Sequence, residues 1–147
     1  ELAEAFELDT AKAGKQKPHA PAPLQVAAAV MAIRRKKLPD PGEYANAGSF
    51  FKNPVIDAST AQRLQIRSAT PYRFAQGYKV SAAQLMDLAG WKGARSGDVG
   101  CWPKQPLVLV NYGQASAEHL LGFAQEIQRS IAERFEIQLE LEPSVVS

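Results

Sequence analysis

The chain has 147 residues, of which 46% are apolar, and a formal net charge of +2. This length predicts one domain whose core needs no disulfide or metal ion to stabilise it. The nearly balanced charge argues against nonspecific nucleic-acid binding. The single cysteine, Cys101, excludes an internal disulfide. Together with the two histidines of the chain, His19 and His119, it gives no zinc-binding spacing. We therefore expect a protein of a reducing cytosol that binds neither nucleic acid nor metal.

The first part of the sequence is typical of a linker. Residues 9–23 contain three prolines, three lysines and no large apolar side chain, so they bury too little surface to offset the entropy of ordering. We predict that residues 1–23 are the end of a preceding domain and a flexible linker, and that residues 24–147 form a C-terminal domain. Because the sequence begins with Glu1, we expect a fragment of a longer protein, without a signal peptide.

A helix is predicted first, over residues 23–37, because proline suits a first helical turn and the basic residues 34–37 suit a last one. Its mostly apolar stretch, 24–33, is about half as long as a membrane-spanning helix, so no membrane segment is expected. Residues 48–54 are typical of a short strand with aromatic residues in its middle. Ser59 is a candidate N-cap for a helix that runs to about residue 66.

Two short strands, 72–74 and 78–80, are predicted around a turn at residues 76–77. Ser81 is the candidate N-cap of the next helix, which Gly90 is placed to end. The continuous apolar run 107–110 predicts a central strand covered on both faces.

The longest helix is predicted to begin at Ser116, because an apolar stripe with helical spacing follows it. Residues 135–141 alternate between apolar and polar, which predicts a half-buried final strand. Strands and helices are interspersed without regular βαβ units, so we predict an α+β fold with a small mixed sheet packed against several helices.

Several polar residues could carry chemistry, although each also has an ordinary structural interpretation. Ser49 lies between glycine and aromatic residues but could simply satisfy backbone groups, since no serine-hydrolase motif surrounds it. Glu142 lies two residues after Glu140 on the predicted last strand, where both carboxylates share one face; that face could equally be solvated surface. Cys101 is expected to be a buried, inert thiol.

The candidate ligand-binding residues are three lysines and two amides. The lysines stand at element ends or in turns, where an ammonium can reach an anion such as a phosphate, or can be ordinary surface charge. The amides can donate and accept hydrogen bonds, although turn chemistry explains an amide before a proline equally well. These residues are Lys37, Lys79, Lys92, Asn53 and Gln105.

Taken together, these segments resemble one family. The motifs are KLPDP at 37–41, NAGSFFKNP at 46–54, GWKG at 90–93, QPLVLVN at 105–111 and LELE at 139–142. They resemble UDP-N-acetylenolpyruvoylglucosamine reductase, the flavoenzyme MurB of bacterial peptidoglycan synthesis, in its longer, type I form. The resemblance covers roughly residues 24–143 and implies a C-terminal, substrate-binding domain of a cytoplasmic enzyme.

The resemblance also implies roles for individual residues. Ser49 would be the general acid that protonates a substrate carbon, and Glu142 would help stabilise an enol-like intermediate. The residues implied to hold the substrate, UDP-N-acetylglucosamine enolpyruvate, are Lys37, Asn53, Tyr72, Lys79, Lys92 and Gln105. Arg34 would face the flavin, and Lys37 is the candidate charge that favours the alkoxide of Ser49.

The cofactors implied are FAD, bound by N-terminal domains that precede this fragment, and NADPH as reductant; no metal is implied. On this interpretation the fragment is inactive alone and needs those FAD-binding domains as its partner. The alternative, from another functional class, is a stand-alone UDP-sugar or anion-binding module without redox activity. Ser144 and Trp102-Pro103 depart from the commoner residues of the family.

Overall fold

The computed structural model describes residues 23–144. The chain divides into two units between Leu38 and Pro39, and each unit is described by itself. Apart from Pro23, the predicted linker lies outside the described residues. The domain boundary after residue 23 therefore stays a prediction.

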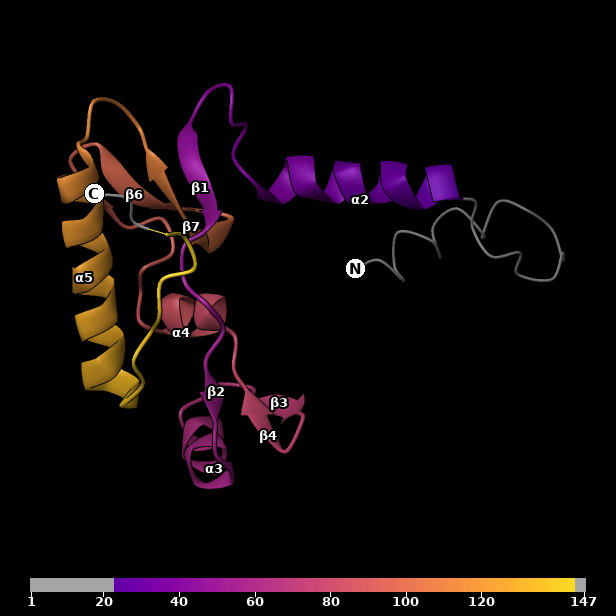
Figure 1. Cartoon of the computed structure of the whole chain (residues 1–147), viewed down its shortest axis with the longest axis vertical. Helices are drawn as coiled ribbons and strands as arrows, with labels where there is room; N and C mark the ends of the chain where they lie inside the picture. Colours follow the sequence, from indigo (N-terminus) through magenta and orange to yellow (C-terminus); the bar gives the residue numbers. More distant parts are fainter. Residues whose placement is uncertain (1–22, 145–147) are drawn as a thin grey trace, which may run out of the picture. The chain divides into compact units, whose positions relative to one another are not determined.

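The described part of the first unit is helix α2 (Pro23–Lys37), as the sequence predicts (Figure 1). Proline occupies its first position and four cations fill its last turn, where they favour the negative end of the helix dipole. No residue of α2 is buried, and Leu24 is 85% exposed.

Two antiparallel sheets organise the second unit (Figure 1). The larger sheet has the strand order β1-β7-β6-β5, and the smaller has the order β2-β4-β3. The strands are β1 (Ala45–Ser49), β2 (Val55–Ile56), β3 (Tyr72–Phe74), β4 (Gly77–Lys79), β5 (Arg95–Ser96), β6 (Val99–Trp102) and β7 (Gln105–Asn111). The α+β class is confirmed, with two sheets instead of one and with antiparallel pairing throughout the named strands.

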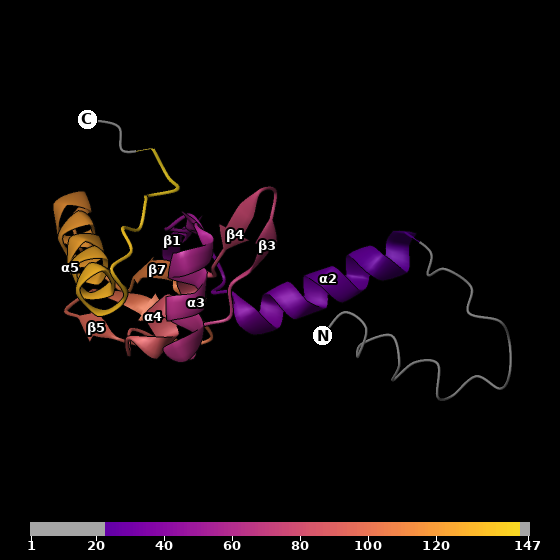
Figure 2. The ribbon, with the colours of Figure 1, turned by 90° about the horizontal axis from the view of Figure 1, so that it is seen from below.

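Three helices belong to this unit, namely α3 (Ala58–Ile66), α4 (Ala82–Leu88) and α5 (Ala117–Phe135). Helix α4 contacts β7 and α5, α5 contacts β6, and α3 contacts β4. Figure 2 shows the same ribbon from below, with α3 and α4 beside the strands that they contact. The larger sheet is thus covered by α4 and α5, which bury its apolar face, and the smaller sheet contacts α3. No helix within residues 23–144 has the length and apolarity needed to cross a bilayer.

The core lies between the larger sheet and helices α4 and α5. The predicted central strand is confirmed, because residues 107–110 of β7 are all buried. The predicted stripe of α5 is buried at Ala124, Ile127 and Ile131, and Ser116 caps this helix by accepting a hydrogen bond from the His119 N–H. Cys101 is also buried, as expected, and its desolvation raises the pKa of the thiol to about 12.

The prediction of a final strand over residues 135–141 is wrong at its first residue. Phe135 is the last residue of α5, because it continues the buried stripe of Ile127 and Ile131 at a spacing of four residues. The helix ends at Glu136, which adopts a left-handed conformation with φ 59°. Beyond it the predicted alternation of buried and exposed residues holds, but backbone pairing is limited to a bridge between Leu141 and Phe51.

The strand predicted at 48–54 and the cap predicted at Ser59 also differ from the structure. Strand β1 ends at Ser49. The Phe50 N–H still donates to the Leu107 carbonyl of β7, and residues 50–52 then pair with the C-terminal segment. Helix α3 is capped by Asp57, whose carboxylate accepts a hydrogen bond from the Thr60 N–H at 2.7 Å. This contact is the main cause that lowers the pKa of Asp57. A charged acceptor interacts favourably with the helix dipole, which explains why the cap lies two residues earlier.

Candidate functional site

An open hollow of about 570 Å³ lies where three segments of the second unit meet. One wall is the stretch 52–55, which leads into β2; the second is Lys79 of β4; the third is the segment 138–142. The lining residues are Lys52, Asn53, Pro54, Val55, Lys79, Gln138, Glu140 and Glu142. Three residues that the sequence analysis singled out at distant positions, Asn53, Lys79 and Glu142, are therefore brought together.

Backbone hydrogen bonds hold two of these walls beside each other. The Lys52 N–H donates to the Glu140 carbonyl at 2.9 Å, and the Glu142 N–H donates to the Phe50 carbonyl at 3.0 Å. Because alternate residues of an extended chain share a face, the two glutamates point away from the core, and Glu140 lies 3.4 Å from the Lys52 ammonium. This ion pair is largely exposed, so it contributes little to stability. The charged groups that line the hollow are the ammonium groups of Lys52 and Lys79 and the carboxylates of Glu140 and Glu142.

The Asn53 side chain accepts one hydrogen bond from the backbone through Oδ1 and keeps its Nδ2 donor available. Its side-chain oxygen accepts a hydrogen bond from the Ala82 N–H at 2.9 Å, at the beginning of α4. This contact fixes the amide plane, and no acceptor for the Asn53 Nδ2 is found within residues 23–144. Nδ2 can therefore donate to a ligand in the hollow while Oδ1 anchors the side chain.

Lys79 lies in the middle of the smaller sheet, directly between Val55 and Tyr72 in the strand register. Residues paired in this way place their side chains on the same face. Phe74 shares that face, and its ring centre lies 4.4 Å from the Lys79 ammonium. Because Tyr72 is 48% and Phe74 45% exposed, the face offers aromatic rings beside a cation. Such a surface suits a planar ring joined to an anionic group.

Ser49 ends β1 immediately after a β-bulge. The pairing of Asn46 with Val110 and of Ser49 with Val108 leaves one extra residue in β1, and Gly48 in this bulge has a φ of +72°. Bulges redirect the side chains that follow them and occur often beside active sites. Ser49 is exposed, and its hydroxyl has no hydrogen-bond partner within the described residues. No hydrogen bond to a backbone group supports the structural interpretation of Ser49 within the described residues, and its catalytic role stays a prediction.

Ser49 and Glu142 are linked through a single backbone contact. Phe50, the residue after Ser49, is the one whose carbonyl accepts the Glu142 N–H. Ser49 therefore lies one residue from the backbone hydrogen bond that holds Glu142. Ser49 itself does not line the hollow.

The remaining candidates lie elsewhere. The Lys92 ammonium is 3.2 Å from the Asp87 carboxylate, and Gln105 begins β7 opposite Trp102; neither lines the hollow. Arg34 and Lys37 belong to the first unit. The roles of these four residues stay predictions, as do those of the candidates around the hollow.

Residues that the sequence analysis did not assign to a site also line the hollow. Lys52 could have been found from its place beside Asn53, and Glu140 from its spacing to Glu142, since both signals were visible in the sequence. Gln138 and Val55 carry no such signal, because their place depends on how the segments meet.

The family model described as UDP-N-acetylenolpyruvoylglucosamine reductase, C-terminal domain, matches residues 40–146. The chain belongs to this family. Curated relatives with the name UDP-N-acetylenolpyruvoylglucosamine reductase include one from Pseudomonas putida, which is 50% identical over 120 residues, covering 80% of this chain and 35% of the relative.

Two further reductases of this name have a similar sequence identity over a similar share of the chain. The protein of Ralstonia nicotianae is 47% identical over 130 residues, covering 86% of this chain and 38% of its own length. That of Xanthomonas euvesicatoria is 48% identical over 125 residues, covering 82% and 36%. The chain therefore spans little more than a third of the length of these relatives, and the region matched is the C-terminal domain of the family.

Proposed function

We propose that this chain is the C-terminal part of a flavin-dependent reductase of the bacterial cytoplasm. The reaction would convert UDP-N-acetylglucosamine enolpyruvate to UDP-N-acetylmuramate, with NADPH as reductant, in peptidoglycan synthesis. The observation that carries this proposal is the meeting of Asn53, Lys79 and Glu142 in one hollow. These residues come from three separate segments, and Asn53 and Glu142 lie in motifs of the family.

The described residues alone do not suit a flavin. The hollow is open and lined mainly by polar and charged side chains, whereas a flavin ring needs an enclosing and largely apolar pocket. Arg34, the one residue expected to face the flavin, lies on a helix without buried residues. On this proposal the N-terminal domains of the longer enzyme would bind FAD, act as the partner of this chain and supply the hydride.

The chain itself would provide the proton. Reduction of the enolpyruvyl double bond adds a hydride to the methylene carbon and a proton to the adjacent carbon. The Ser49 hydroxyl is suited to donate this proton because it is exposed and has no partner within the described residues, and solvent can then return a proton to its oxygen. The Glu142 carboxylate would help stabilise the enol-like intermediate.

The other residues would bind the substrate. The Asn53 Nδ2 donor and the Lys79 ammonium suit the diphosphate and the sugar, and Tyr72 beside Lys79 offers a ring for the uracil. Lys92 and Gln105 are proposed as further contacts to the anionic and amide groups.

The test is turnover by the full-length protein. NADPH oxidation should require UDP-N-acetylglucosamine enolpyruvate, and mass spectrometry should find UDP-N-acetylmuramate as product. The present chain, purified alone, should be colourless, oxidise no NADPH and bind the substrate only weakly in calorimetry. Stoichiometric flavin on the isolated chain would contradict the assignment of FAD to other domains. Submicromolar substrate binding by this chain, without turnover by the full-length protein, would instead support a stand-alone binding module.

A further inference from the structure

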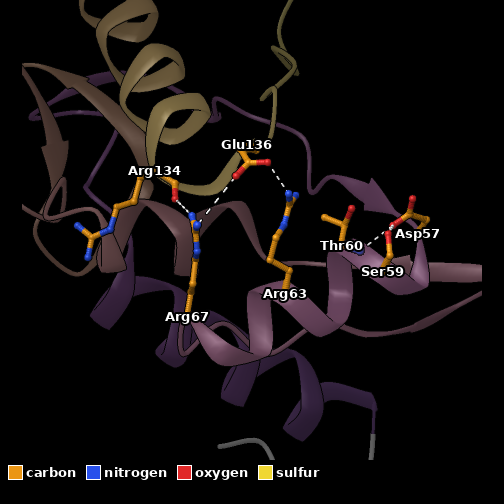
Figure 3. A network of polar contacts seen from close by, with 7 residues as sticks. All are labelled: Asp57, Ser59, Thr60, Arg63, Arg67, Arg134 and Glu136. Atoms are coloured by element: carbon orange, nitrogen blue, oxygen red, sulfur yellow. Dashed lines mark hydrogen bonds and ion pairs between the residues drawn. The ribbon is translucent and has the colours of Figure 1, made fainter.

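A group of charged side chains joins helix α3 to the end of α5 (Figure 3). Arg63 of α3 donates to the Glu136 carboxylate, and the Arg67 guanidinium lies 3.9 Å from the other Glu136 oxygen. Arg67 also donates to the Arg134 carbonyl in the last turn of α5. We call Arg63, Arg67 and Glu136 the arginine clamp.

The two ends of the clamp are continuous with two walls of the hollow. Helix α3 follows β2 directly, and so continues the wall formed by residues 52–55. Glu136 directly precedes the segment 137–142, which forms the opposite wall and ends with Glu142. Gln128 of α5 also holds this segment, since its amide nitrogen donates to the Leu139 carbonyl at 2.6 Å.

The clamp joins α3 to the start of the C-terminal segment, where the backbone of residues 23–144 leaves the two walls unjoined. The hydrogen bonds at Lys52 and Glu142 join the walls at one end. At the other end, within the described chain, no backbone hydrogen bond joins residues 53–57 to 136–139, and a second hollow of about 300 Å³ separates them. There the clamp is the polar connection between α3 and the start of the C-terminal segment.

The backbone conformation of Glu136 favours glycine, so we infer that the glutamate side chain has a role besides the end of the helix. Its φ of 59° and ψ of 38° are left-handed, a conformation that glycine and asparagine adopt with less strain. A helix stop alone would therefore be better made by glycine. The glutamate adds the two contacts to Arg63 and Arg67.

We propose that the arginine clamp is a positioning device for Glu142. By fixing the start of the segment 137–142 against α3, it sets the distance between the two walls and the place of the Glu142 carboxylate. Glu136 does not line the main hollow, so it acts through the backbone and not on the substrate. The kinetic part of this inference rests on the proposed function, whereas its structural part does not.

The exposure of the clamp sets the size of the effect. Its side chains are 38% (Arg63), 42% (Arg67) and 58% (Glu136) exposed, and ion pairs in such positions are weak and screened by salt. Loss of the clamp should therefore leave the chain folded. The rate of the substrate-dependent step should fall by about three- to tenfold.

Amide hydrogen exchange in the 147-residue chain tests the positioning without any substrate. In Glu136→Gln, the amides of Lys52 and Glu142 should exchange several-fold faster, while the amides of β7 keep their rates. Glu136→Gly, which suits the left-handed backbone, should have the same effect, so backbone strain is separated from loss of the side chain. Glu133→Gln is the matched control, because Glu133 is exposed on the same helix and has no partner within residues 23–144.

Kinetics of the full-length protein test the consequence. Arg63→Gln and Glu136→Gln should each lower kcat about three- to tenfold without changing the KM for NADPH, and the double variant should be no slower than either single one. Arg63→Lys should retain most of the rate, and the loss in Glu136→Gln should shrink in about 1 M salt.

The proposal is overturned if the Lys52 and Glu142 amides exchange at wild-type rates in Glu136→Gln, or if the two single losses multiply in the double variant. Absence of substrate turnover by the wild-type protein would refute the proposed function instead. In that case the exchange rates alone decide whether the clamp positions the segment.

Discussion

Ser49→Ala is the variant that separates proton donation from every structural role of this residue. The serine is exposed, its hydroxyl makes no hydrogen bond within the described chain, and its backbone pairing with Val108 does not depend on the side chain. We therefore expect the free energy of unfolding to change by less than about 0.5 kcal/mol, as for other surface substitutions. A urea titration of the variant checks this requirement first.

The expected kinetic loss is far larger than this structural change. General acid catalysis contributes about 100- to 10,000-fold, which corresponds to roughly 2.7–5.5 kcal/mol in the barrier of the proton-transfer step. Stopped-flow absorbance of the full-length protein can follow two half-reactions. Reduction of the bound flavin by NADPH should keep the wild-type rate, whereas its reoxidation by the enolpyruvyl substrate should slow by several orders of magnitude.

Ser96→Ala is the matched control, because Ser96 is an exposed strand serine of the larger sheet that lies outside the hollow. It should reoxidise at the wild-type rate. If Ser49→Ala does so as well, the serine is not the proton donor, and the chemistry proposed for this site fails.

Four further expectations follow from the described contacts. Glu142→Gln should slow the same substrate-dependent half-reaction in stopped flow, because its partner is the intermediate and not NADPH. Lys79→Met should raise the KM for the substrate about tenfold with little change in kcat, as expected for uniform binding. Phe51→Ala should lower the free energy of unfolding in urea by about 3–5 kcal/mol, because this ring is 1% exposed. The Cys101 thiol, with a pKa of about 12, should react with a disulfide reagent at pH 8 about a thousandfold more slowly in the native chain than in urea.

The same thiol gives a pH dependence with a defined sign. Burial raises its pKa from the ordinary 9.0 to about 12 in the folded chain, so the unfolded state loses its proton first as the pH rises. Its contribution to stability is fully present below pH 9 and decreases between pH 9 and 12. Cys101→Ala should flatten the loss of stability over that interval in denaturant titrations.

Clear results would contradict each expectation. A Glu142→Gln variant that slows flavin reduction by NADPH would place the carboxylate in the other half-reaction. A Lys79→Met variant with a lower kcat and an unchanged KM would indicate a role in chemistry. A small effect of Phe51→Ala would mean that the core collapses around the missing ring. Rapid native labelling of Cys101 would mean that β6 opens easily.

The sequence determined the elements whose signals are local. Helices α2, α4 and α5 and strand β7 were predicted close to their observed bounds, because capping serines, glycine or proline stops and apolar periodicity depend on neighbouring residues only. The family was also evident in the sequence, since the motif at 46–54 keeps its residues in a fixed order. Residue roles, in contrast, came only with that resemblance.

Tertiary structure decided what depends on contacts between distant segments. Phe135 fits both a helix stripe and a strand alternation, and packing against the core resolved it as the end of α5. The segment after it was predicted to be a strand, but its partner, residues 50–52, is shared with the edge of the larger sheet, so only a short pairing forms. The hollow joins residues 52–55, 79 and 138–142. No local pattern encodes such a meeting, because it is set by which apolar faces are buried together.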